Sequence, residues 1–453
     1  MRAFGLAFLA LVVLPVKLEP GTTYSVSINS DRFNSFRSAE NPKVAVTPYL
    51  ITFTTAGKAP KKGALLPAEK WREDLAYLAS ELPKRHIKLF AKLTQEEFKR
   101  EVDQLDLKIP GLREDEIMVG LGRLVASVGD EHTGIAFSTG LTYLPLGLYW
   151  FKDGVFVTSA AEDYRKALRC RVEKIGGVEI EKVCAALTPL VAHANDALAR
   201  NSMPYLLSVA QFLRGTEIMS DSDKITVQLR PESGEPFTME LAPLEYPRAA
   251  KWVDAAEEGK DTPLYRANRK KPYWADYLGD KAVIYFLYNS CVEPNELPFA
   301  RFQTDLERLM SSHPSAKLVI DLRNNSGGSS AILDPFIDLL KGNKDFDRKG
   351  KLFVIVGRRT FSSAIMNAVR LRQETKSVLV GEPTGGSVNH FGEVRTFELP
   401  NSKASVSYST KYFRNSDKDE LTITPDLLVE LSSRDFFSGR DPVLKAVVNF
   451  VPK

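Results

Sequence analysis

The sequence predicts a mixed α/β protein in three consecutive parts, on the strength of three patterns. Residues 273–453 alternate apolar, β-branched stretches with amphipathic ones, which is typical of strands and helices layered in an α/β fold. Residues 67–128 carry apolar residues at helical spacing, and residues 141–245 are rich in short β-type stretches. We therefore expect a helical domain, a β-rich domain and an α/β core, in that order.

The overall composition is that of an ordinary globular protein. Of the 453 residues, 43% are hydrophobic and 26% are charged, and the net charge of +4 comes from scattered Lys and Arg rather than from a basic stripe. This distribution argues against nucleic acid as a partner. The three cysteines have no CxxC spacing, so they predict no zinc site and allow at most one disulfide.

The first residues predict a targeting segment. One arginine precedes an apolar run in residues 1–17, which is typical of a signal peptide, although no small-residue cleavage site follows. The run is too short to span a membrane, and no other stretch is long and apolar enough. We expect an extracytoplasmic protein, either periplasmic or secreted. Residues 18–57 alternate as strands do, in "TTYSVSI" and "YLITFTT", and resemble the closing strands of a bacterial Ig-like domain.

The helical domain is expected over residues 65–140. Its apolar residues recur at steps of three and four, and they comprise Trp71, Leu75, Leu78 and Leu82 in one helix and Ile117, Leu121, Leu124 and Val128 in another. Thr94 and Glu97 have the spacing of a capping box, and Gly129 is placed to end the last helix. The stripes predict a packed core and carry no chemistry.

The β-rich domain is expected over residues 141–250. Its segment "ALRCRVEKIGGVEIEKV" is similar to the core of a PDZ domain, in which a strand carrying I-N-G leads into a short helix. A groove of that kind accepts an extended peptide by strand addition, so this domain favours a peptide substrate.

A strand-to-helix corner in the α/β core holds two adjacent serines, in "GRRTFSSAIMNA" (residues 357–368). The preceding "KLFVIV" predicts a buried strand, and the following residues have helical spacing. Serine at such a corner commonly caps the helix, because its oxygen accepts from the free N–H groups of the first turn. A nucleophile can also lie on such a tight turn, with helix-start amides near a developing oxyanion. The corner alone leaves both interpretations open.

Two glycine-rich loops follow other strands of the same core. They are "DLRNNSGG" (Asp321 to Gly328) and "VGEPTGG" (Val380 to Gly386). Paired glycines let one backbone approach another and can direct N–H groups at an anion. Ligands of α/β sheets bind at the ends of strands, so we expect the serines and both loops to form one site.

Together these motifs resemble the C-terminal-processing (tail-specific) serine peptidase family. "DLRNNSGG", "TFSSA" and "GEPTGG" have the family's order and spacing, and "DEHTGI" (Asp130 to Ile135) is similar to the D-x-H-T signature of its histidine-using, tricorn-like branch. "YNSC", "FELPNS" and "YSTKYF" resemble an uncharacterised bacterial subgroup of that family. The resemblance covers residues 67–453. It implies a crotonase-like (ClpP/crotonase-type) α/β core over residues 265–453, hydrolysis of peptide bonds, and no metal or organic cofactor.

The resemblance also implies a catalytic serine and two amide donors. Counting back nineteen residues from Gly381 of the G-E-P-T motif gives Ser362 as the nucleophile. The family's oxyanion donors are the amide after the nucleophile and a glycine amide of the D-L-R loop, which correspond to Ser363 and to Gly327 or Gly328. The family pattern S-x-x-E is broken here, because position 365 is Ile.

The general base implied by the resemblance is a histidine. The lysine that another branch of the family uses would fall at position 387, which is Ser in this chain. His132 of the D-x-H-T signature is the expected base, and His390, close to the G-E-P-T motif, is the alternative. We expect solvated or capping roles for the remaining three histidines, His86, His193 and His313.

A carboxylate should orient that histidine. In the tricorn-like branch it lies shortly before a P-D pair, which here offers Asp419 and Glu420, with Asp419 favoured by spacing. The expected function is a serine peptidase that acts on a peptide or protein substrate. Two alternatives stay open, a non-catalytic ligand-binding protein on the same fold and an esterase or amidase acting on small molecules. Neither the cleavage specificity nor the oligomeric state follows from the sequence.

Overall fold

The computed structural model describes residues 23–28, 49–54, 66–137, 140–220, 223–245, 247–256 and 262–452, in two compact units that divide after Leu65. The first unit contains an antiparallel pair of strands, β1 (Thr23–Ile28) and β2 (Tyr49–Thr54), within the segment expected to alternate as strands. The predicted signal segment, residues 1–17, lies outside the described residues. The second unit holds every predicted site residue.

The second unit begins with three helices, which are α1 (Ala68–Arg85), α2 (Gln95–Lys108) and α3 (Glu114–Ala126). Both predicted apolar stripes are buried, with every member at most 3% exposed. The predicted capping box is present, because Thr94 N donates to Glu97 Oε2 at 2.7 Å and Glu97 N donates to Thr94 Oγ1 at 3.1 Å. Gly129 has a φ of +73° and ends the third helical stretch, after which the chain reaches strand β3 (Gly134–Ala136).

A seven-stranded antiparallel sheet follows, with three helices beside it. Its strands are β4 (Leu146–Phe151), β5 (Gly154–Ala161), β6 (Arg171–Ile175), β7 (Val178–Glu179), β8 (Ile225–Arg230), β9 (Phe237–Leu241) and β10 (Trp252–Asp254). The helices are α4 (Ile180–Leu187), α5 (Asp196–Ser208) and α6 (Ala210–Gly215). Gly176 and Gly177, both at positive φ, turn β6 back into β7 ahead of α4.

The C-terminal part is a six-stranded sheet covered on both faces. The strands, in spatial order, are β11 (Tyr273–Leu278), β12 (Val283–Tyr288), β13 (Lys317–Asp321), β14 (Leu352–Val356), β15 (Val378–Gly381) and β18 (Leu427–Leu428). β11 is antiparallel to β12, and the other neighbours are parallel. The helices are α7 (Phe299–Ser312), α8 (Asp334–Leu340), α9 (Ser363–Glu374), α10 (Ser433–Phe437) and α11 (Pro442–Asn449).

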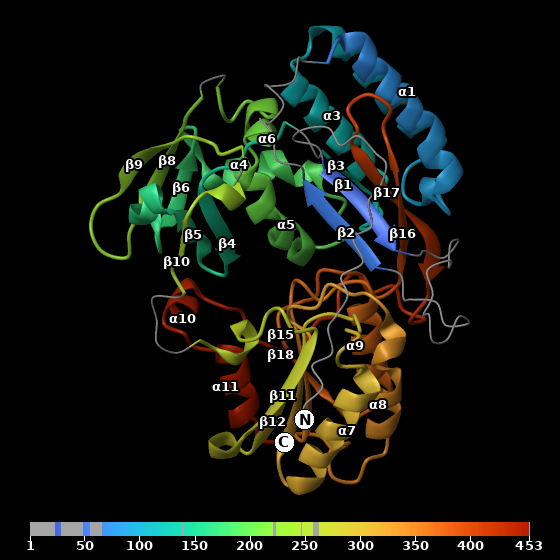
Figure 1. The fold of residues 1–453 in the computed structure, drawn as a ribbon, viewed down its shortest axis with the longest axis vertical. Helices are drawn as coiled ribbons and strands as arrows, with labels where there is room; N and C mark the ends of the chain where they lie inside the picture. Colours follow the sequence, from blue (N-terminus) through green and yellow to red (C-terminus); the bar gives the residue numbers. More distant parts are fainter. Residues whose placement is uncertain are drawn as a thin grey trace, which may run out of the picture. The chain divides into compact units, whose positions relative to one another are not determined.

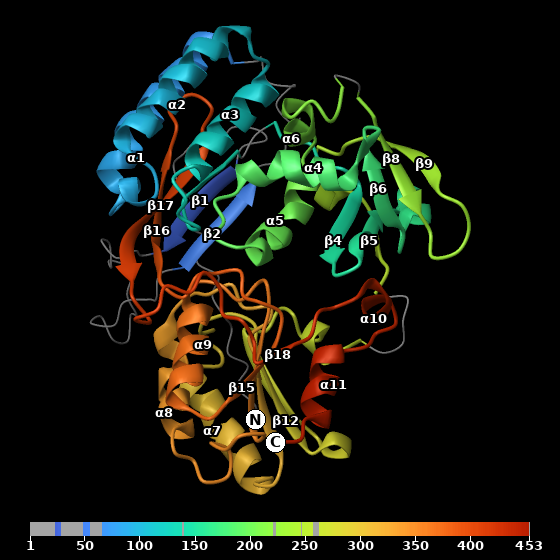
Figure 2. The same ribbon diagram turned by 180° about the vertical axis from the view of Figure 1, so that it is seen from behind.

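Alternate residues of these buried strands enter two separate cores. Ile284, Phe286, Ile320 and Val354 pack with helices α7, α8 and α9, whereas Tyr285, Val319 and Phe353 pack with α11 on the opposite face. Figures 1 and 2 show the three helices on one face of the sheet and α11 on the other. The arrangement confirms the expected mixed α/β fold and leaves the carboxyl ends of the parallel strands free to carry loops.

One hairpin leaves the α/β part and completes the helical part. Strands β16 (His390–Glu398) and β17 (Ser405–Phe413) pair with each other, and β17 also pairs with β3, with Val406 opposite Ile135. Phe397, Leu399 and Val406 lie in the same core as the residues of α1 and α3, beside which the hairpin runs in Figures 1 and 2. The hydrophobic core of the helical part therefore includes residues from far along the sequence. The turn before β3 is also bonded to the loop after β15, through Glu131 and Ser387.

Three further expectations concern the chain as a whole. Cys170, Cys184 and Cys291 are all buried and free, so the single disulfide that the cysteine count allowed is not formed. Across the described residues, no helix has both the length and the apolar character needed to cross a membrane. The same residues contain no group of three or more His, Cys, Asp or Glu side chains arranged to hold a metal ion.

Candidate active site

The predicted loops meet at one edge of the parallel sheet. Residues 322–328 follow β13, residues 357–362 follow β14 and residues 382–388 follow β15, and the ends of parallel strands share one edge. The loops are in direct contact, because a Cβ atom placed on Gly327 would lie 2.8 Å from Ser362 Cβ. A Cβ atom on Gly385 would lie 2.3 Å from Arg358 O. The glycines are required here because two backbones pass too closely for side chains.

Ser362 lies between β14 and α9 in a strained backbone conformation. Its φ and ψ are 52° and −128°, and positive φ is rare for a residue with a side chain. The turn is held by Thr360, whose Oγ1 donates to Leu322 O at 2.9 Å, and by Phe361, whose N–H donates to Asn325 O at 3.1 Å. The Ser362 hydroxyl does not cap α9, and it bonds to no other described residue. The capping interpretation therefore does not apply to this serine, whose hydroxyl is free to react.

Ser363 has a bonded hydroxyl that the sequence did not predict. The residue is 8% exposed, and its Oγ donates to Gly328 O at 2.6 Å. The bond joins the start of α9 to the glycine loop after β13. The Ser363 amide is the first of α9 and donates to no acceptor among the described residues, as expected for the first turn of a helix.

The structure separates the two glycines that the sequence left equivalent. The Gly327 amide donates to Asn325 Oδ1 at 2.9 Å and is thereby occupied. The Gly328 amide donates to no acceptor in the described part of the chain, while its carbonyl accepts from Ser363. Gly328 has a φ of +133°, and a Cβ atom there would lie 2.2 Å from Cys291 O, so no other residue fits. Gly328 and Ser363 thus supply the two unoccupied amides beside Ser362.

The remainder of the "DLRNNSGG" motif anchors this loop. Arg323 donates to both Asp321 and Asp441, the latter through two bonds of 3.0 Å, and Tyr285 OH donates to Asp321 Oδ2 at 2.6 Å. Asn325 donates from Nδ2 to Tyr288 O at 2.9 Å. A bidentate arginine between two buried carboxylates ties β13 to the start of α11. The motif is therefore largely structural, with only its last two residues next to the nucleophile.

The "DEHT" turn is organised by Asp130. Its carboxylate accepts from His86 Nε2 at 3.0 Å, from Ser409 Oγ and Thr133 Oγ1 at 2.6 Å, and from His132 N at 3.0 Å. His86 Nδ1 accepts from Lys88 N, so Nε2 carries the proton and donates. Burial alone would raise the pKa of Asp130, but these four hydrogen bonds outweigh it and lower the pKa to about 2. His86 is consequently a buried partner of Asp130 rather than the solvated or merely capping residue expected from the sequence.

His132 is held beside the nucleophile loop. Its ring stacks on Phe361, the neighbour of Ser362, with the ring centroids 4.4 Å apart and the planes 27° apart. Both ring nitrogens are buried, and neither has a hydrogen-bond partner in the part of the chain that the structure describes. Burial, with a smaller contribution from His390, lowers the pKa of His132 to about 4. No hydrogen bond joins Ser362 to His132 in this conformation.

His390 lies next to His132. Their ring centroids are 5.5 Å apart and their planes 15° apart. His390 Nδ1 lies 3.0 Å from Ser387 O and 3.3 Å from Val388 O, and Nε2 is buried without a partner among the described residues. Burial lowers the pKa of His390, against the effect of the two carbonyl groups. The structure thus brings both candidate histidines to the same place.

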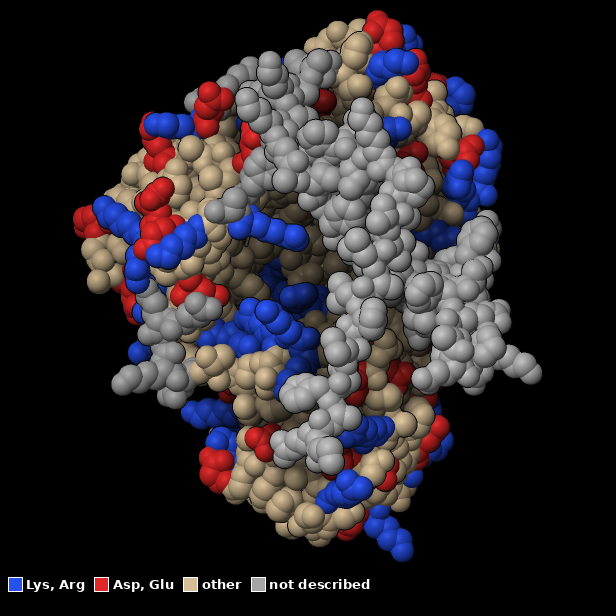
Figure 3. Space-filling model, viewed as in Figure 1, with Lys and Arg blue, Asp and Glu red and all other residues tan. Residues whose placement is uncertain are grey.

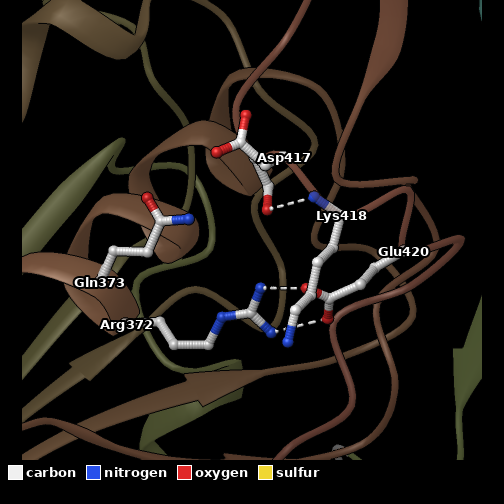
Figure 4. Close-up of a pocket in the computed structure, with 6 residues that line it drawn as sticks. Arg372, Gln373, Asp417, Lys418 and Glu420 are labelled. Carbon is white, nitrogen blue, oxygen red and sulfur yellow. Dashed lines mark hydrogen bonds and ion pairs between the residues drawn. The ribbon is translucent and has the colours of Figure 1, made fainter.

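Neither predicted acid reaches these histidines. Asp419 is exposed, and its Oδ1 accepts from Asn389 Nδ2 at 3.3 Å. The Glu420 carboxylate accepts two bonds from Arg372, at 2.9 and 3.0 Å, beside a surface hollow of about 710 Å³ (Figure 4). Arg372 lies about 14 Å along α9 from Ser363 at 1.5 Å per residue. The geometry therefore does not support the expected role of Asp419, because the loop that carries both acids is held by other partners.

A different carboxylate lies close to the site. Glu131 accepts from Ser387 N at 3.1 Å and from Ser387 Oγ at 2.8 Å. Burial raises the pKa of Glu131, although the two bonds from Ser387 oppose this effect. Ser387 stands where another branch would have lysine, and its bond to Glu131 ties the "DEHT" turn to the loop after β15. Sequence reasoning missed this pair, since residues 256 positions apart give no local signal.

Two arginines, Arg358 and Arg359, lie in the loop that leads from β14 to Ser362. Arg358 is buried, donates to Trp150 O, and forms an ion pair with Glu382 at 2.9 Å, whereas Arg359 is exposed. On the face drawn in Figure 3, Lys and Arg side chains gather around a central hollow.

Comparison with known proteins relates part of the chain to a peptidase family. Residues 336–429 match the model of peptidase family S41. Mature CPAF is 14% identical with a TM-score of 0.57, covering 84% of this chain and 98% of its own, and a CPAF mutant gives a TM-score of 0.58 at 13% identity, covering 85% and 99%. The photosystem II D1 C-terminal processing protease is 13% identical with a TM-score of 0.38, over 82% of this chain and 98% of its own. The comparison with curated proteins gives no match.

The family match falls on the candidate site, and the likeness to mature CPAF concerns the fold. The matched residues include the Ser362 corner, the "GEPTGG" loop and β15, which form the centre of the site described above. Over residues 336–429, the chain is therefore similar to peptidase family S41.

Proposed function

We propose that the chain hydrolyses peptide bonds with Ser362 as nucleophile, His132 as general base, and the amides of Gly328 and Ser363 as the oxyanion hole. The observation that carries the proposal is the strained Ser362, with an unbonded hydroxyl, between two unoccupied amides. Preorganised amides stabilise charge that develops in the transition state, and removing one such donor typically costs ~3 kcal/mol of barrier. The stacking of His132 on Phe361 keeps the base within reach of the neighbouring serine.

The proton follows a closed path in this mechanism. Ser362 Oγ attacks the scissile carbonyl carbon while its proton moves to a ring nitrogen of His132. His132 then gives that proton to the leaving amine, which departs and leaves an acyl-enzyme at Ser362. Water, deprotonated by His132, hydrolyses the ester and regenerates the serine. Hydrogen bonds of this kind are often long in unliganded enzymes and shorten in the complex, so their absence between Ser362 and His132 does not exclude the pair.

The remaining features fit a peptide substrate. The strand–glycine turn–helix of β6, β7 and α4 supports a PDZ-like character for the β-rich part, and the helix-covered parallel sheet supports a crotonase-like core. A cleavage preference near protein C-termini and an extracytoplasmic location belong to the same proposal. They rest on the family resemblance and on the apolar start of the sequence.

A fluorophosphonate probe tests the nucleophile. We expect covalent labelling of the folded protein at Ser362, shown by peptide mapping, and no labelling of a Ser362→Ala variant. Heat-denatured protein is the control, since an activated serine requires the folded site. Labelling at Ser363, or none on protein that cleaves peptides, would contradict the assignment.

The pH dependence of kcat/KM tests the base. A neutral imidazole must accept the serine proton, so protonation of His132 abolishes activity as the pH falls. Because burial lowers the pKa of His132 to about 4, we expect the acid limb near pH 4 rather than at the ordinary histidine value of 6.5. A His132→Ala variant should lose about a thousandfold or more in kcat. An acid limb at 6.5 or above would show that His132 does not have the environment described here.

A further inference from the structure

We propose that His390 is a positioning residue for catalysis, whose Nε2 accepts a hydrogen bond from His132 whenever His132 carries the serine proton. A neutral imidazole then takes the place of the carboxylate expected at residue 419. The inference rests on the proposed function, because it assigns a partner to the proposed base. The observation behind it is that both ring nitrogens of His132 and Nε2 of the adjacent His390 are buried and have no hydrogen-bond partner among the described residues.

The tautomer of His390 is fixed by its neighbours. Nδ1 faces only carbonyl oxygens, those of Ser387 at 3.0 Å and Val388 at 3.3 Å, and a carbonyl can only accept. Nδ1 therefore carries the hydrogen, and Nε2 of the neutral ring is left with its lone pair. The residue is only 6% exposed and this nitrogen is buried, so its lone pair can accept a hydrogen bond from a neighbouring N–H or O–H group.

The neighbouring ring with unpartnered nitrogens is that of His132. The two rings are nearly parallel, with planes 15° apart and centroids 5.5 Å apart. In coplanar imidazoles joined by one N–H···N bond, the centroids would lie about 5 Å apart, given a donor–acceptor distance near 3 Å. The rings are stacked in this conformation, so forming the bond requires His132 to turn on Phe361 until the two rings become coplanar. A buried polar atom without a partner is unfavourable, and such a bond would give partners to two of the three ring nitrogens.

The other charged groups near His132 are already occupied. Asp130 accepts from four donors and Glu131 accepts twice from Ser387, whereas His86 donates to Asp130. The Glu420 carboxylate is held by Arg372, and on its other side His390 contacts only the ring of Phe413, at 5.7 Å. Among the described residues, His390 Nε2 is the free acceptor next to His132.

The catalytic step then balances without a carboxylate. The Ser362 proton moves to one ring nitrogen of His132, which makes His132 an imidazolium with a hydrogen on each nitrogen. The hydrogen on the other nitrogen is donated to His390 Nε2, and His390 keeps its own hydrogen on Nδ1. When His132 gives its proton to the leaving amine, the ring becomes neutral again and the bond to His390 weakens. His390 gains and loses no proton in the cycle.

Two substitutions of His390 test the proposal on a peptide substrate. His390→Phe keeps a ring that can pack on Phe413 and His132 but removes the acceptor, whereas His390→Gln places a neutral carbonyl oxygen near the position of Nε2. We expect kcat to fall about tenfold to a hundredfold in the Phe variant, the range for a hydrogen bond to a charged group, with KM little changed. The Gln variant should keep kcat within about threefold of the wild type. His313→Phe and His313→Gln are matched controls, since His313 stacks on Tyr277 away from the site.

The acid limb of the pH profile distinguishes positioning from packing. Both variants lack the small effect by which the His390 ring lowers the pKa of His132, but only His390→Gln keeps an acceptor for the imidazolium. The apparent pKa should therefore be lower in His390→Phe than in His390→Gln. A merely structural role for His390 would lower activity and thermal stability without separating the acid limbs of the two variants. Equal loss in folded Phe and Gln variants, or wild-type kcat in both, would overturn the proposal.

The tautomer can be measured independently of any variant. With only five histidines in the chain, ¹⁵N-histidine labelling and long-range ¹H–¹⁵N correlation spectra resolve each ring. We expect His390 as the Nδ1–H tautomer at pH 7, and the Nε2–H tautomer would overturn the proposal. Fluorophosphonate labelling of Ser362 reports the nucleophile without reference to His390. A failure of the proposed function is therefore visible separately from a failure of the histidine pair.

Discussion

At the scale of the residue, two adjacent serines have different tasks. Ser362 is strained with an unbonded hydroxyl, and Ser363 is buried with its hydroxyl on Gly328 O. Positions 362 and 363 follow from the spacing of motifs in the sequence. The hydrogen bond of Ser363 does not, because it depends on how closely two loops from different strands approach each other. The same limit applies to the acids, since spacing placed Asp419 near the histidine but could not show that Asn389 binds its carboxylate.

Replacing Ser363 measures the contribution of that hydroxyl. Ser363→Ala keeps the Ser363 amide donor but removes the hydrogen bond to the Gly328 carbonyl. The glycine loop, which supplies the other proposed amide donor, is then held less firmly. We expect kcat to fall about tenfold with KM nearly unchanged, the size of one hydrogen bond of about 1.5 kcal/mol. Steady-state kinetics on one peptide provide the measurement.

The control for this experiment is Ser433→Ala. It also removes a buried serine hydroxyl that donates a hydrogen bond, in this case to Asp153. It should leave kcat unchanged. If Ser363→Ala also has wild-type kcat, the glycine loop keeps its shape without the bond. Inactivity as complete as in Ser362→Ala would instead show that the Ser363 hydroxyl takes part in the chemistry.

At the scale of the element, local signals predicted local structure well. The helical stripes, the capping box at Thr94 and the helix end at Gly129 depend on neighbours in sequence, and all are present. The pairing of β17 with β3 joins residues about 270 positions apart, so no local sequence pattern predicts it. That pairing brings Ser409 to Asp130, and so it fixes the turn on which His132 lies.

Asp130→Asn tests how much this junction depends on the carboxylate. Asparagine offers one acceptor oxygen where four donors now converge, and its amide hydrogens would face some of those donors. We expect the free energy of unfolding at pH 7 to fall by about 2–4 kcal/mol, measured by urea denaturation. Peptidase activity should fall as well, because the His132 backbone loses its anchor.

Asp103→Asn is the matched control, since its exposed carboxylate pairs only with Lys99. Surface changes of this kind usually alter stability by less than about 0.5 kcal/mol. A loss in Asp130→Asn no larger than in the control would mean that the pairing of β17 with β3 holds the turn by itself.

At the scale of the whole molecule, buried histidines make stability depend on pH. Burial lowers the pKa of His132 from 6.5 to about 4 and lowers that of His390 as well. Between pH 6.5 and pH 4, these histidines are protonated in the unfolded chain but remain neutral in the folded chain. The free energy of unfolding should therefore decrease as the pH falls from 6.5 toward 4. Asp130, with a pKa of about 2 against 3.8, should extend the loss at lower pH, because its folded carboxylate also resists protonation.

Urea denaturation at several pH values between 7.5 and 4 measures this slope. The double variant His132→Phe/His390→Phe removes both groups, so its stability should change less over that range than the wild type's. The difference between the two curves isolates the histidines from carboxylates such as Glu131, whose raised pKa acts in the opposite direction. Parallel curves would show that the histidines titrate alike in the folded and unfolded chains.

The hairpin of β16 and β17 determines when the N-terminal helices can complete their core during synthesis of the chain. Helices α1 to α3 are synthesised early, but their core lacks Phe397, Leu399 and Val406 until the hairpin has emerged. Burying side chains of this size contributes roughly 1.5–3 kcal/mol each, so the early part remains incomplete without them. His132 and Ser362 are therefore brought together only when most of the chain has been synthesised, and a nascent chain that already contains Ser362 does not yet have the proposed base beside it.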